Sequence, residues 1–313
     1  MKVYYSIDDF QKLDKAVVTT GTFDGVHIGH RKILAQLNKV AQNLGGESVL
    51  LTFFPHPRMV LQPDLDLKLI NSQKEKIELL KSTGLDHLII HPFTAEFSRT
   101  SSLDFVRNIL VNQIGAKKLV IGYDHHFGRN REGSFEHLKE FGPLYGFEVE
   151  EIPAQDVEDT TVSSTKIRNA ISEGVIETAN QYLKYQFQLS GKVVEGEHIG
   201  RTIGFPTANL VVGDSYKIIP ANGVYAVRVN FPNETEKPSL GGMCNIGIRP
   251  TFGGKFQTIE IHLFDFSEDL YGQQLEVHFI KSLRKEMKFD GPEALKSQLK
   301  EDEKAARLVL SLR

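Results

Sequence analysis

The sequence predicts two unlike domains, an α/β domain followed by an all-β domain. The chain has 313 residues, about twice the length of a typical single domain. Strand-like and helix-like segments alternate through the first half, which favours a doubly wound, Rossmann-like parallel sheet with helices on both faces. The second half carries strands with period-two alternation between glycine-rich turns, which favours a small antiparallel β-barrel. We therefore place the domains at residues 1–185 and 186–313.

The elements of the first half follow from the spacing of its apolar residues. Short apolar runs predict strands at residues 16–20, 48–53, 87–91, 118–122 and 147–152. Apolar residues that recur every three or four positions predict helices at residues 33–44, 74–81 and 103–112. The first of these helices follows a glycine-rich turn and ends at Gly45-Gly46, a common helix stop. A further helical segment, residues 167–184, is expected to bridge the two domains.

Alternation of apolar and polar residues defines the elements of the second half. It predicts strands at residues 188–194, 223–229, 258–264 and 275–279. The pairs Gly241-Gly242 and Gly253-Gly254 are expected to lie in turns between strands. One amphipathic helix, residues 292–312, is expected to follow the barrel at the C-terminus.

Charge, cysteine content and the N-terminus exclude several classes of protein. The 37 Lys and Arg residues against 40 Asp and Glu residues give a net charge of −3, whereas non-specific nucleic-acid binding relies on a basic surface. Cys244 is the only cysteine, which excludes an intramolecular disulfide and a CxxC metal site. The first residues lack the apolar core of a signal peptide, and no apolar run approaches the ~20 residues that span a bilayer. We expect a cytoplasmic protein with neither nucleic-acid nor membrane partners.

The first candidate site is the turn at residues 21–30, Gly-Thr-Phe-Asp-Gly-Val-His-Ile-Gly-His, between a predicted strand and a helix. Phosphates bind well at such a helix start because free backbone N–H groups and the helix dipole face the anion, and Gly21 and Gly25 permit close approach. His27 and His30 share one face, so both can donate hydrogen bonds to a phosphoryl group as charge develops on it. The alternatives are two surface histidines at a solvated helix start, or a zinc-binding pair without a third ligand of matched spacing.

Three later segments supply groups that would complete a nucleotide site. Residues 52–57, Thr-Phe-Phe-Pro-His-Pro, end a predicted strand, where open α/β sheets bind ligands; the alternative is a proline-rich turn. Residues 122–129 follow another strand and include Asp124. Residues 162–168, Val-Ser-Ser-Thr-Lys-Ile-Arg, place three hydroxyl groups and two cations at a helix start, either to cap the helix or to bind phosphate with Arg168 as a clamp.

In this order, the four segments resemble the HxGH nucleotidyltransferases, and more narrowly the adenylyltransferase half of the bacterial FAD synthetases. Residues 21–30 match that family's pattern fully, whereas the sequence departs from it at His125, where the family has an aromatic residue, and at Val162, where it has Ile. The second half resembles the family's riboflavin kinase barrel, with Gly-Phe-Pro-Thr-Ala-Asn at residues 204–209. The resemblance implies that riboflavin and ATP give FMN, and that adenylyl transfer from a second ATP then gives FAD and pyrophosphate.

The barrel motifs also make chemical sense by themselves. Thr207 and Asn209 are two residues apart, so on a strand they face the same way. Their hydroxyl and amide oxygens suit Mg²⁺; a capped turn and a buried threonine are the alternative. Glu260 alternates with apolar residues and shares a strand face with Thr258 and His262, as a surface glutamate would. The resemblance implies instead that Glu260 is the catalytic base that takes the proton of the riboflavin hydroxyl.

The resemblance assigns site residues to several roles. The catalytic residues are implied to be His27, His30, Arg168 and Glu260. ATP in the adenylyltransferase site is implied to contact Gly21, Thr22, Phe23, Asp24, Gly25, His27, His30, Asp124, Ser163, Ser164, Thr165 and Arg168. ATP in the kinase site is implied to contact Gly196, Gly200, Arg201, Gly204, Phe205, Pro206, Thr207 and Asn209. The flavin is implied to contact Phe54, Pro55, His56, Pro57, Asn245, Glu260 and Arg284, the last of which is otherwise a solvated charge. Mg²⁺ is implied to bind Thr207 and Asn209.

The resemblance further implies Mg²⁺ as cofactor, ATP as co-substrate, and FMN and FAD as products, and we expect a monomer or a weak homo-oligomer. Two other functions stay open at this point. One is a related nucleotidyltransferase, such as a cytidylyltransferase or a pantetheine-phosphate adenylyltransferase; the other is a non-catalytic flavin-binding protein. The related nucleotidyltransferases share the His-x-Gly-His turn but lack the Pro-Thr-Ala-Asn barrel, so the second half discriminates between them.

Overall fold

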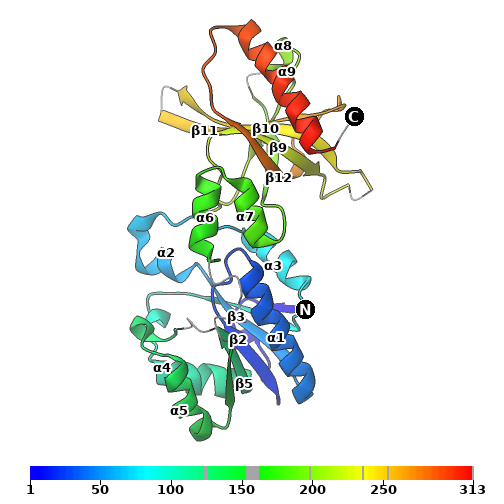
Figure 1. Ribbon diagram of the computed structural model, residues 1–313. Helices are drawn as coiled ribbons and strands as arrows, with labels where there is room; N and C mark the ends of the chain where they lie inside the picture. Colours follow the sequence, from blue (N-terminus) through cyan, green and yellow to red (C-terminus); the bar gives the residue numbers. More distant parts are fainter. Residues whose placement is uncertain (123–125, 153–161, 197–198, 235, 252–253, 312–313) are drawn as a thin grey trace. The chain divides into compact units, whose positions relative to one another are not determined.

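The protein folds as two units, Met1–Ser164 and Thr165–Arg313 (Figure 1). The computed structural model describes residues 1–122, 126–152, 162–196, 199–234, 236–251 and 254–311. The first unit is α/β and the second is built on β-strands, so the predicted fold class is confirmed. The units meet in sequence at Ser164/Thr165, while the domain boundary at residues 185/186 stays a prediction.

A six-stranded parallel sheet forms the centre of the first unit, with the strand order β1-β4-β3-β2-β5-β6. The strands are β1 Lys2–Tyr4, β2 Ala16–Thr20, β3 Glu47–Phe54, β4 His87–Pro92, β5 Ala116–Gly122 and β6 Glu148–Ile152. All five strands predicted from the sequence are present. The additional strand β1 has three residues, which is too short for a period-two pattern to identify.

Helices cover both faces of this sheet, as predicted. They are α1 Ile28–Leu44, α2 Pro57–Leu61, α3 Gln73–Lys81, α4 Ser102–Asp104, which continues as the π-helical η4 Phe105–Ile114, and α5 Phe135–Tyr145. Short 3₁₀ turns lie at η1 Ile7–Asp9, η2 Pro63–Leu65, η3 Phe97–Arg99 and η5 Arg129–Arg131. Val17 faces a core with α1 and α3, and its neighbour Val18 faces a second core with η4 and α5. Helix α5 was not predicted because Gly142 and Pro143 interrupt its pattern.

The direction of strand addition reverses beside β2. Strands β3 and β4 add on one side of it, whereas β5 and β6 add on the other. In open α/β sheets, ligands bind at the carboxyl ends of the strands at such a reversal point. Helix α1 starts directly after β2, so the fold places the turn at residues 21–27 where a nucleotide site is expected.

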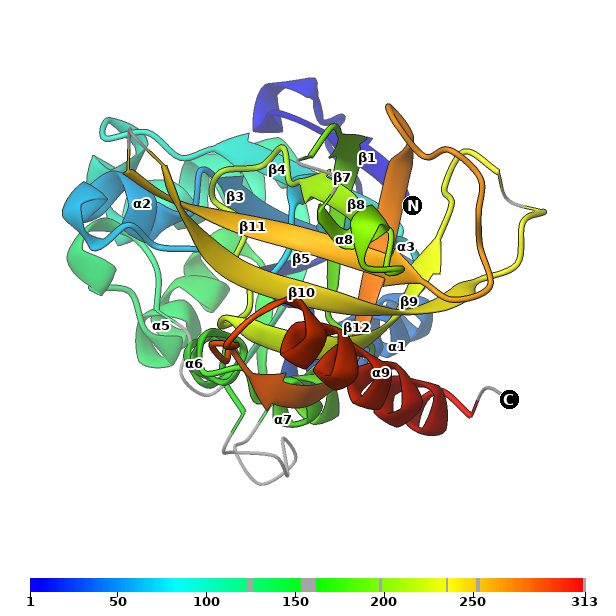
Figure 2. The same cartoon turned by 90° about the horizontal axis from the view of Figure 1, so that it is seen from above.

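The second unit is a closed antiparallel barrel with the strand order β10-β11-β8-β7-β12-β9. Its strands are β7 Gln188–Val194, β8 Ala208–Val211, β9 Gly223–Asn230, β10 Leu240–Thr251, β11 Gly254–Leu263 and β12 Gln274–Lys285. Its helices are α6 Ser164–Ser172, α7 Ile176–Leu183, α8 Ile199–Thr202 and α9 Pro292–Val309. The C-terminal helix α9 packs on β9, β10 and β12, and it is drawn in red over these strands in Figure 2.

Two expectations for the second half are corrected by the structure. Gly241-Gly242 does not form a turn but lies inside β10, because the barrel brings its strands so close that a Cβ atom at Gly242 would lie 2.6 Å from the His262 carbonyl oxygen. Residues 167–184 do not form one helix. Gly174, at φ +77°, separates α6 from α7, and all but the first residue of these two helices belongs to the barrel unit.

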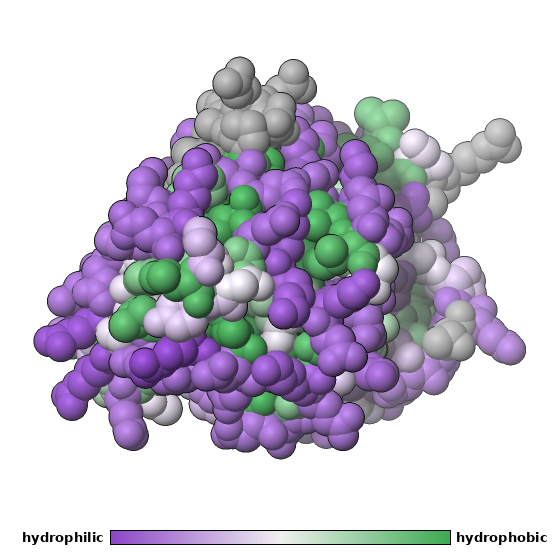
Figure 3. All heavy atoms as spheres, turned by 90° about the horizontal axis from the view of Figure 1, so that it is seen from below, coloured by the Kyte–Doolittle hydropathy of each residue, from purple (hydrophilic) through white to green (hydrophobic). Residues whose placement is uncertain are grey.

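One face of the molecule is mostly polar. Figure 3 shows one face on which hydrophilic residues predominate and hydrophobic residues form separate small patches. In the described ranges, none of the helices combines the length and the apolar character needed to span a bilayer.

Candidate active sites

The turn between β2 and α1 has a strained backbone. Phe23 and Val26 adopt φ values of +48° and +38°, and Gly25 lies at +90°. A positive φ is unusual for any non-glycine residue and is an outlier for a β-branched one. Phe23 and Val26 are nonetheless buried, so packing holds them in place. Such enforced strain is typical of functional loops.

The two histidines of this turn are stacked on each other. The ring centroids of His27 and His30 are 3.6 Å apart, and the Phe23 ring stacks on His30 at 4.6 Å. His27 is the N-cap of α1, and its Nδ1 accepts a hydrogen bond from the His30 backbone N–H at 3.4 Å. Because Nδ1 is an acceptor, the proton of a neutral His27 ring is on Nε2. His27 therefore has an N–H group available for a ligand.

Burial keeps both rings neutral. It lowers the pKa of His27 to about 4. Burial, with the nearby His27 and Lys76, holds the pKa of His30 well below its ordinary value. The Nδ1 atom of His30 is enclosed and has no hydrogen-bond partner in the described part of the protein. At neutral pH, the turn thus presents two uncharged imidazoles, which can donate to an oxyanion.

The zinc alternative for this pair finds no support in the geometry. The stacked rings do not aim two lone pairs at one point, since His27 Nδ1 is engaged by the His30 N–H group. Among the residues that the structure describes, no three His, Cys, Asp or Glu side chains are grouped to hold a metal ion. The surface alternative is wrong for His27, which is buried.

Ser164 of the fourth candidate motif, the last residue of the first unit, contacts the turn. The Ser164 hydroxyl donates to the Asp24 carbonyl oxygen at 2.9 Å. The buried Asp24 carboxylate accepts from the backbone N–H groups of Ile70 and Asn71, so it anchors the loop before α3, and its predicted contact with ATP stays a prediction. Thr165 and Arg168 open the second unit. The clamp role of Arg168 therefore also stays a prediction.

The second and third motifs receive less structural support. His56 Nδ1 accepts from the Arg58 backbone N–H at 3.1 Å, and Pro57 is the first residue of α2. Residues 52–57 thus form a strand end and a capped helix start, as the proline-rich-turn alternative describes. The flavin contacts of this segment stay predictions. Asp124 and His125 lie outside the described residues.

Sequence reasoning missed Lys76, which lies under the turn. It is buried on α3, and its Nζ donates to the Thr22 carbonyl oxygen at 2.5 Å and to Thr52 Oγ1 at 2.8 Å. Burial lowers the pKa of Lys76 to about 8, although Asp24 opposes this effect. One sequence signal was present: Lys76 precedes the apolar Leu80 by four residues, so it lies on the buried face of α3.

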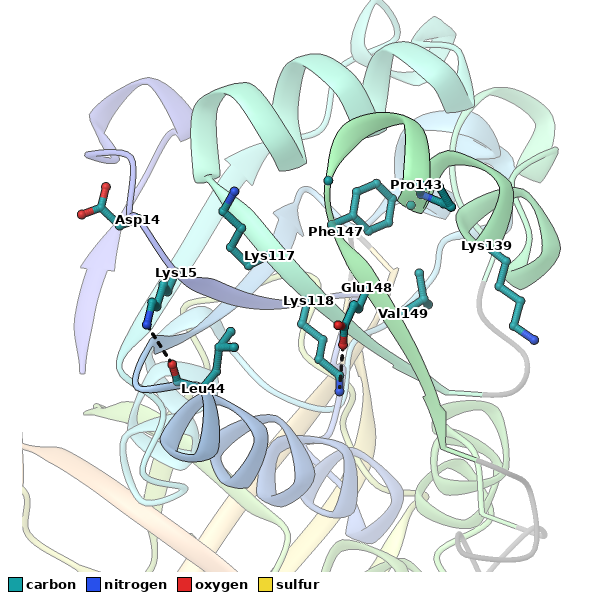
Figure 4. A pocket seen from close by; sticks show the side chains of 12 residues that line it. Asp14, Lys15, Leu44, Lys117, Lys118, Lys139, Pro143, Phe147, Glu148 and Val149 are labelled. Carbon is teal, nitrogen blue, oxygen red and sulfur yellow. Dashed lines mark hydrogen bonds and ion pairs between the residues drawn. The ribbon is translucent and has the colours of Figure 1, made fainter.

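A hollow of about 960 Å³ lies at the opposite end of the sheet, near the amino ends of β5 and β6 (Figure 4). Four lysines line it: Lys15, Lys117, Lys118 and Lys139. However, Lys118 pairs with Glu148 and Glu150, and Lys15 Nζ donates to the Leu44 carbonyl oxygen at the end of α1. Since the carboxyl end of a helix disfavours anions, this hollow does not compete with the turn as a phosphate site.

The barrel unit contains the second candidate site, a hollow of about 340 Å³. The polar face of β11, with Thr258, Glu260 and His262, lines it, while Ile259 and Ile261 are buried on the other face. The alternation predicted for this strand is therefore confirmed. His262 Nδ1 lies 2.8 Å from the Pro206 carbonyl oxygen, and because a carbonyl only accepts, this ring nitrogen carries a proton.

Glu260 faces oxygen donors of the Pro-Thr-Ala-Asn motif. It is directly opposite Asn209 in the β11–β8 ladder, where side chains lie about 5 Å apart. Thr207 lines the same hollow. Ala208 and Leu210 on β8 are buried, whereas Asn209 between them is partly exposed. Thr207 precedes this strand, so the expectation that it shares a face with Asn209 stays a prediction.

Two positions before β8 require glycine because a side chain would not fit there. A Cβ atom at Gly196 would collide with the Asn209 side chain, and one at Gly200 would collide with the Phe205 carbonyl oxygen. The loop backbone thus packs directly on the motif that includes Asn209.

Predicted residues that line the hollow are Gly200, Phe205, Thr207, Asn245, Glu260 and Arg284. Predicted residues outside that lining are Gly196, Arg201, Gly204, Pro206 and Asn209.

Arg284 is not a solvated charge. Its guanidinium group forms a two-pronged ion pair with the buried Asp302 of α9, with its Nε and Nη2 atoms 2.7 to 3.0 Å from the carboxylate oxygens. It also lies over the Phe289 ring.

The hollow has further lining residues that sequence reasoning did not assign, among them Met243, His262, Glu286, Met287 and Phe289. His262 could have been found from the sequence, because the alternation of polar and apolar residues along β11 places it on the same strand face as Glu260.

Comparison with known proteins connects both sites to one family. A model of the FAD synthetase family matches residues 9–166, and a model of the riboflavin kinase family matches residues 183–310. The bifunctional riboflavin kinase/FMN adenylyltransferase of Listeria monocytogenes is 37% identical over 96% of this chain and 94% of its own length. The chain belongs to the bifunctional riboflavin kinase/FMN adenylyltransferase family. The Escherichia coli relative of the same name is 36% identical over 95% of this chain and 93% of its own length.

The likeness extends to solved structures. A crystal structure described as a macrolide-efflux protein from Streptococcus pneumoniae is 33% identical, has a TM-score of 0.87, and covers 98% of both chains. The predicted family and its pair of transferase activities are confirmed. The riboflavin kinase match over the second half also removes the alternative nucleotidyltransferases, which lack that barrel.

Proposed function

We propose that this protein makes FAD in two steps, with the barrel site acting first. Glu260 takes the proton of the riboflavin 5′-hydroxyl as that oxygen attacks the γ-phosphoryl group of ATP, giving FMN and ADP. The observation that carries this assignment is the position of Glu260, on the wall of a hollow and opposite Asn209. Asn245 and Arg284, which line the same hollow, are proposed to contact the flavin.

Mg²⁺ fits the oxygen donors of Thr207 and Asn209, which lie near Glu260. Thr207 supplies a hydroxyl oxygen in the same hollow as Glu260, and Asn209 supplies an amide oxygen directly opposite Glu260 in the strand ladder. These are hard oxygen donors of the kind that Mg²⁺ accepts beside nucleotide oxygens. When bound, the ion would neutralise charge on the ATP phosphates. The protein's own contribution is to hold the Thr207 oxygen in the same hollow as the base and the Asn209 side chain beside the base on the neighbouring strand.

The turn between β2 and α1 is proposed to perform the second step. The FMN phosphate attacks the α-phosphoryl group of ATP and releases pyrophosphate. This nucleophile is already anionic, so positioning and charge stabilisation suffice. The neutral His27 and His30 rings donate hydrogen bonds to the developing charge, and Arg168 is proposed to clamp the phosphates. A cytoplasmic location and a monomeric or weakly associated state remain predictions.

A chromatographic time course tests the whole proposal. With riboflavin, ATP and Mg²⁺, FMN is expected to rise first and then to decline as FAD accumulates. FMN without FAD would remove the role of the turn, and FAD only from supplied FMN would remove the role of the barrel. If neither product forms from oxidised or reduced flavin, the non-catalytic flavin-binding alternative replaces the proposal.

Removing either oxygen donor tests the Mg²⁺ assignment. Thr207→Ala and Asn209→Ala are each expected to raise the Mg²⁺ concentration that gives half-maximal FMN formation by about tenfold or more. Calorimetric titration of Mg²⁺ into the ADP complex should show the same weakening without turnover. Asn230→Ala, on β9 outside the hollow, is the matched control. Unchanged Mg²⁺ dependence in both variants would contradict the assignment.

A further inference from the structure

Lys76 has no role in either proposed reaction, although it lies directly under the turn. It is 6% exposed. Its Nζ donates to the Thr22 carbonyl oxygen and to Thr52 Oγ1, and the Thr52 hydroxyl itself donates to the same carbonyl oxygen at 3.2 Å. Two neutral oxygens, one from the turn and one from β3, therefore hold the ammonium group.

The charge of Lys76 is not neutralised by an ion pair in the described part of the protein. No carboxylate oxygen described there lies within ion-pair distance of its Nζ. Asp24 attracts Lys76, but its carboxylate accepts from the N–H groups of Ile70 and Asn71. A buried, unpaired ammonium group is costly. An anion bound at the turn would offset that cost.

Lys76 also fixes the direction of one peptide group. The Thr22–Phe23 peptide is trans, so its C=O and N–H groups point to opposite sides. Because Lys76 holds the carbonyl, the Phe23 N–H points away from Lys76. This N–H has no partner among the described residues, and Phe23 is held at a strained φ of +48°. A backbone N–H without a protein partner in a strand-to-helix turn is a candidate phosphate donor.

We propose that Lys76 is a positioning residue of the adenylyl-transfer site, which orients the Thr22–Phe23 peptide toward the nucleotide triphosphate and places a positive charge beneath it. This inference rests on the proposed function of the turn as the ATP site. It adds a residue that acts through the backbone of Thr22 and through its charge. It also explains why a lysine lies on the buried face of α3.

The ionisation of Lys76 falls within a measurable range. The charged or titratable groups around it are Asp24 from the turn, His30 from α1 and Glu75 from α3, whose carboxylate accepts from the Ser72 N–H. Burial lowers the pKa of Lys76 to about 8. Its charge is therefore lost as the pH rises through about 8. The phosphate of FMN completes its ionisation below this range, because the second phosphate pKa is about 6.

Replacing the lysine tests the proposal in the full-length protein. Lys76→Met is expected to lower kcat/KM for ATP in the conversion of FMN to FAD by about 100-fold. FMN formation by the barrel should be unchanged, and this result would show that the barrel unit of the variant is folded. Lys74→Met, an exposed position on the same helix, is the matched control. FAD formation within about threefold of wild type in Lys76→Met would overturn the proposal.

The pH profile gives a test that does not depend on the stability of a variant. In wild type, kcat/KM for ATP in FAD formation is expected to fall about tenfold per pH unit above pH 8, whereas FMN formation should not show this decline. In Lys76→Arg, whose side chain stays charged, the decline above pH 8 should be absent. A wild-type profile that is flat up to about pH 10 would overturn the proposal. No FAD from FMN at any pH would instead remove the proposed function, and this inference with it.

Discussion

Glu260→Gln is expected to lose riboflavin phosphorylation and to keep the conversion of supplied FMN to FAD. A positioned general base contributes about 10²- to 10⁴-fold to a rate, and glutamine cannot accept the proton. Glutamine has nearly the same size, and Asn209 remains its neighbour across the strands, so the barrel should fold. The measurement is the initial rate of FMN formation from riboflavin and of FAD formation from FMN, on the same preparation.

A control at a second glutamate distinguishes the loss of the catalytic base from the loss of a negative charge on the barrel. Glu276 lies on β12, outside the hollow, and Glu276→Gln should retain FMN formation. Riboflavin binding to Glu260→Gln, measured by quenching of flavin fluorescence, should persist, because the rest of the hollow is intact. A Glu260→Gln protein that forms FMN within about tenfold of the wild-type rate would exclude Glu260 as the base.

Most of the fold was predictable because burial imposes a period on each element. Strands covered on both faces contain short apolar runs, such as Ala16–Val18 in β2, and β11 alternates polar and apolar residues from Thr258 to Leu263. The exceptions have local causes. Gly241-Gly242 resembles a turn, but only tertiary packing shows that β10 requires glycine there. Likewise, Gly142 and Pro143 conceal α5.

The candidate sites were predictable where a motif is local in sequence. His27 and His30 are three residues apart at one helix start, and Thr207 and Asn209 are two apart, the first just before β8 and the second on it. The missed groups depend on distant pairing. Nothing in the sequence links Lys76 to the Thr22 carbonyl 54 residues away. Contacts of this kind follow from the strand order and not from any local pattern.

Replacing the histidines of the turn should have the opposite effect to replacing Glu260. His27→Asn and His30→Asn are each expected to lower FAD formation from FMN by about 10²- to 10³-fold, as for the loss of one donor to a developing oxyanion. FMN formation should be unchanged. The matched control is His137→Asn, an exposed histidine at the start of α5 in the same unit. If His30→Asn keeps wild-type FAD formation, this ring is not a donor in the reaction.

The same histidines should make the first unit sensitive to acid. His27 has a pKa of about 4 in the folded protein, against about 6.5 when unfolded, and this difference is worth about 3 kcal/mol. Because the folded pKa is the lower one, the unfolded state binds the proton more readily. The contribution is therefore complete above about pH 6.5 and is lost as the pH falls toward 4. Hydrogen exchange of peptides from β2 and α1, corrected for intrinsic rates, should show this loss, and His27→Asn should show a smaller one. Equal acid sensitivity in the two proteins would mean that His27 has the same pKa in the folded and unfolded states, so burial would not be what keeps this ring neutral.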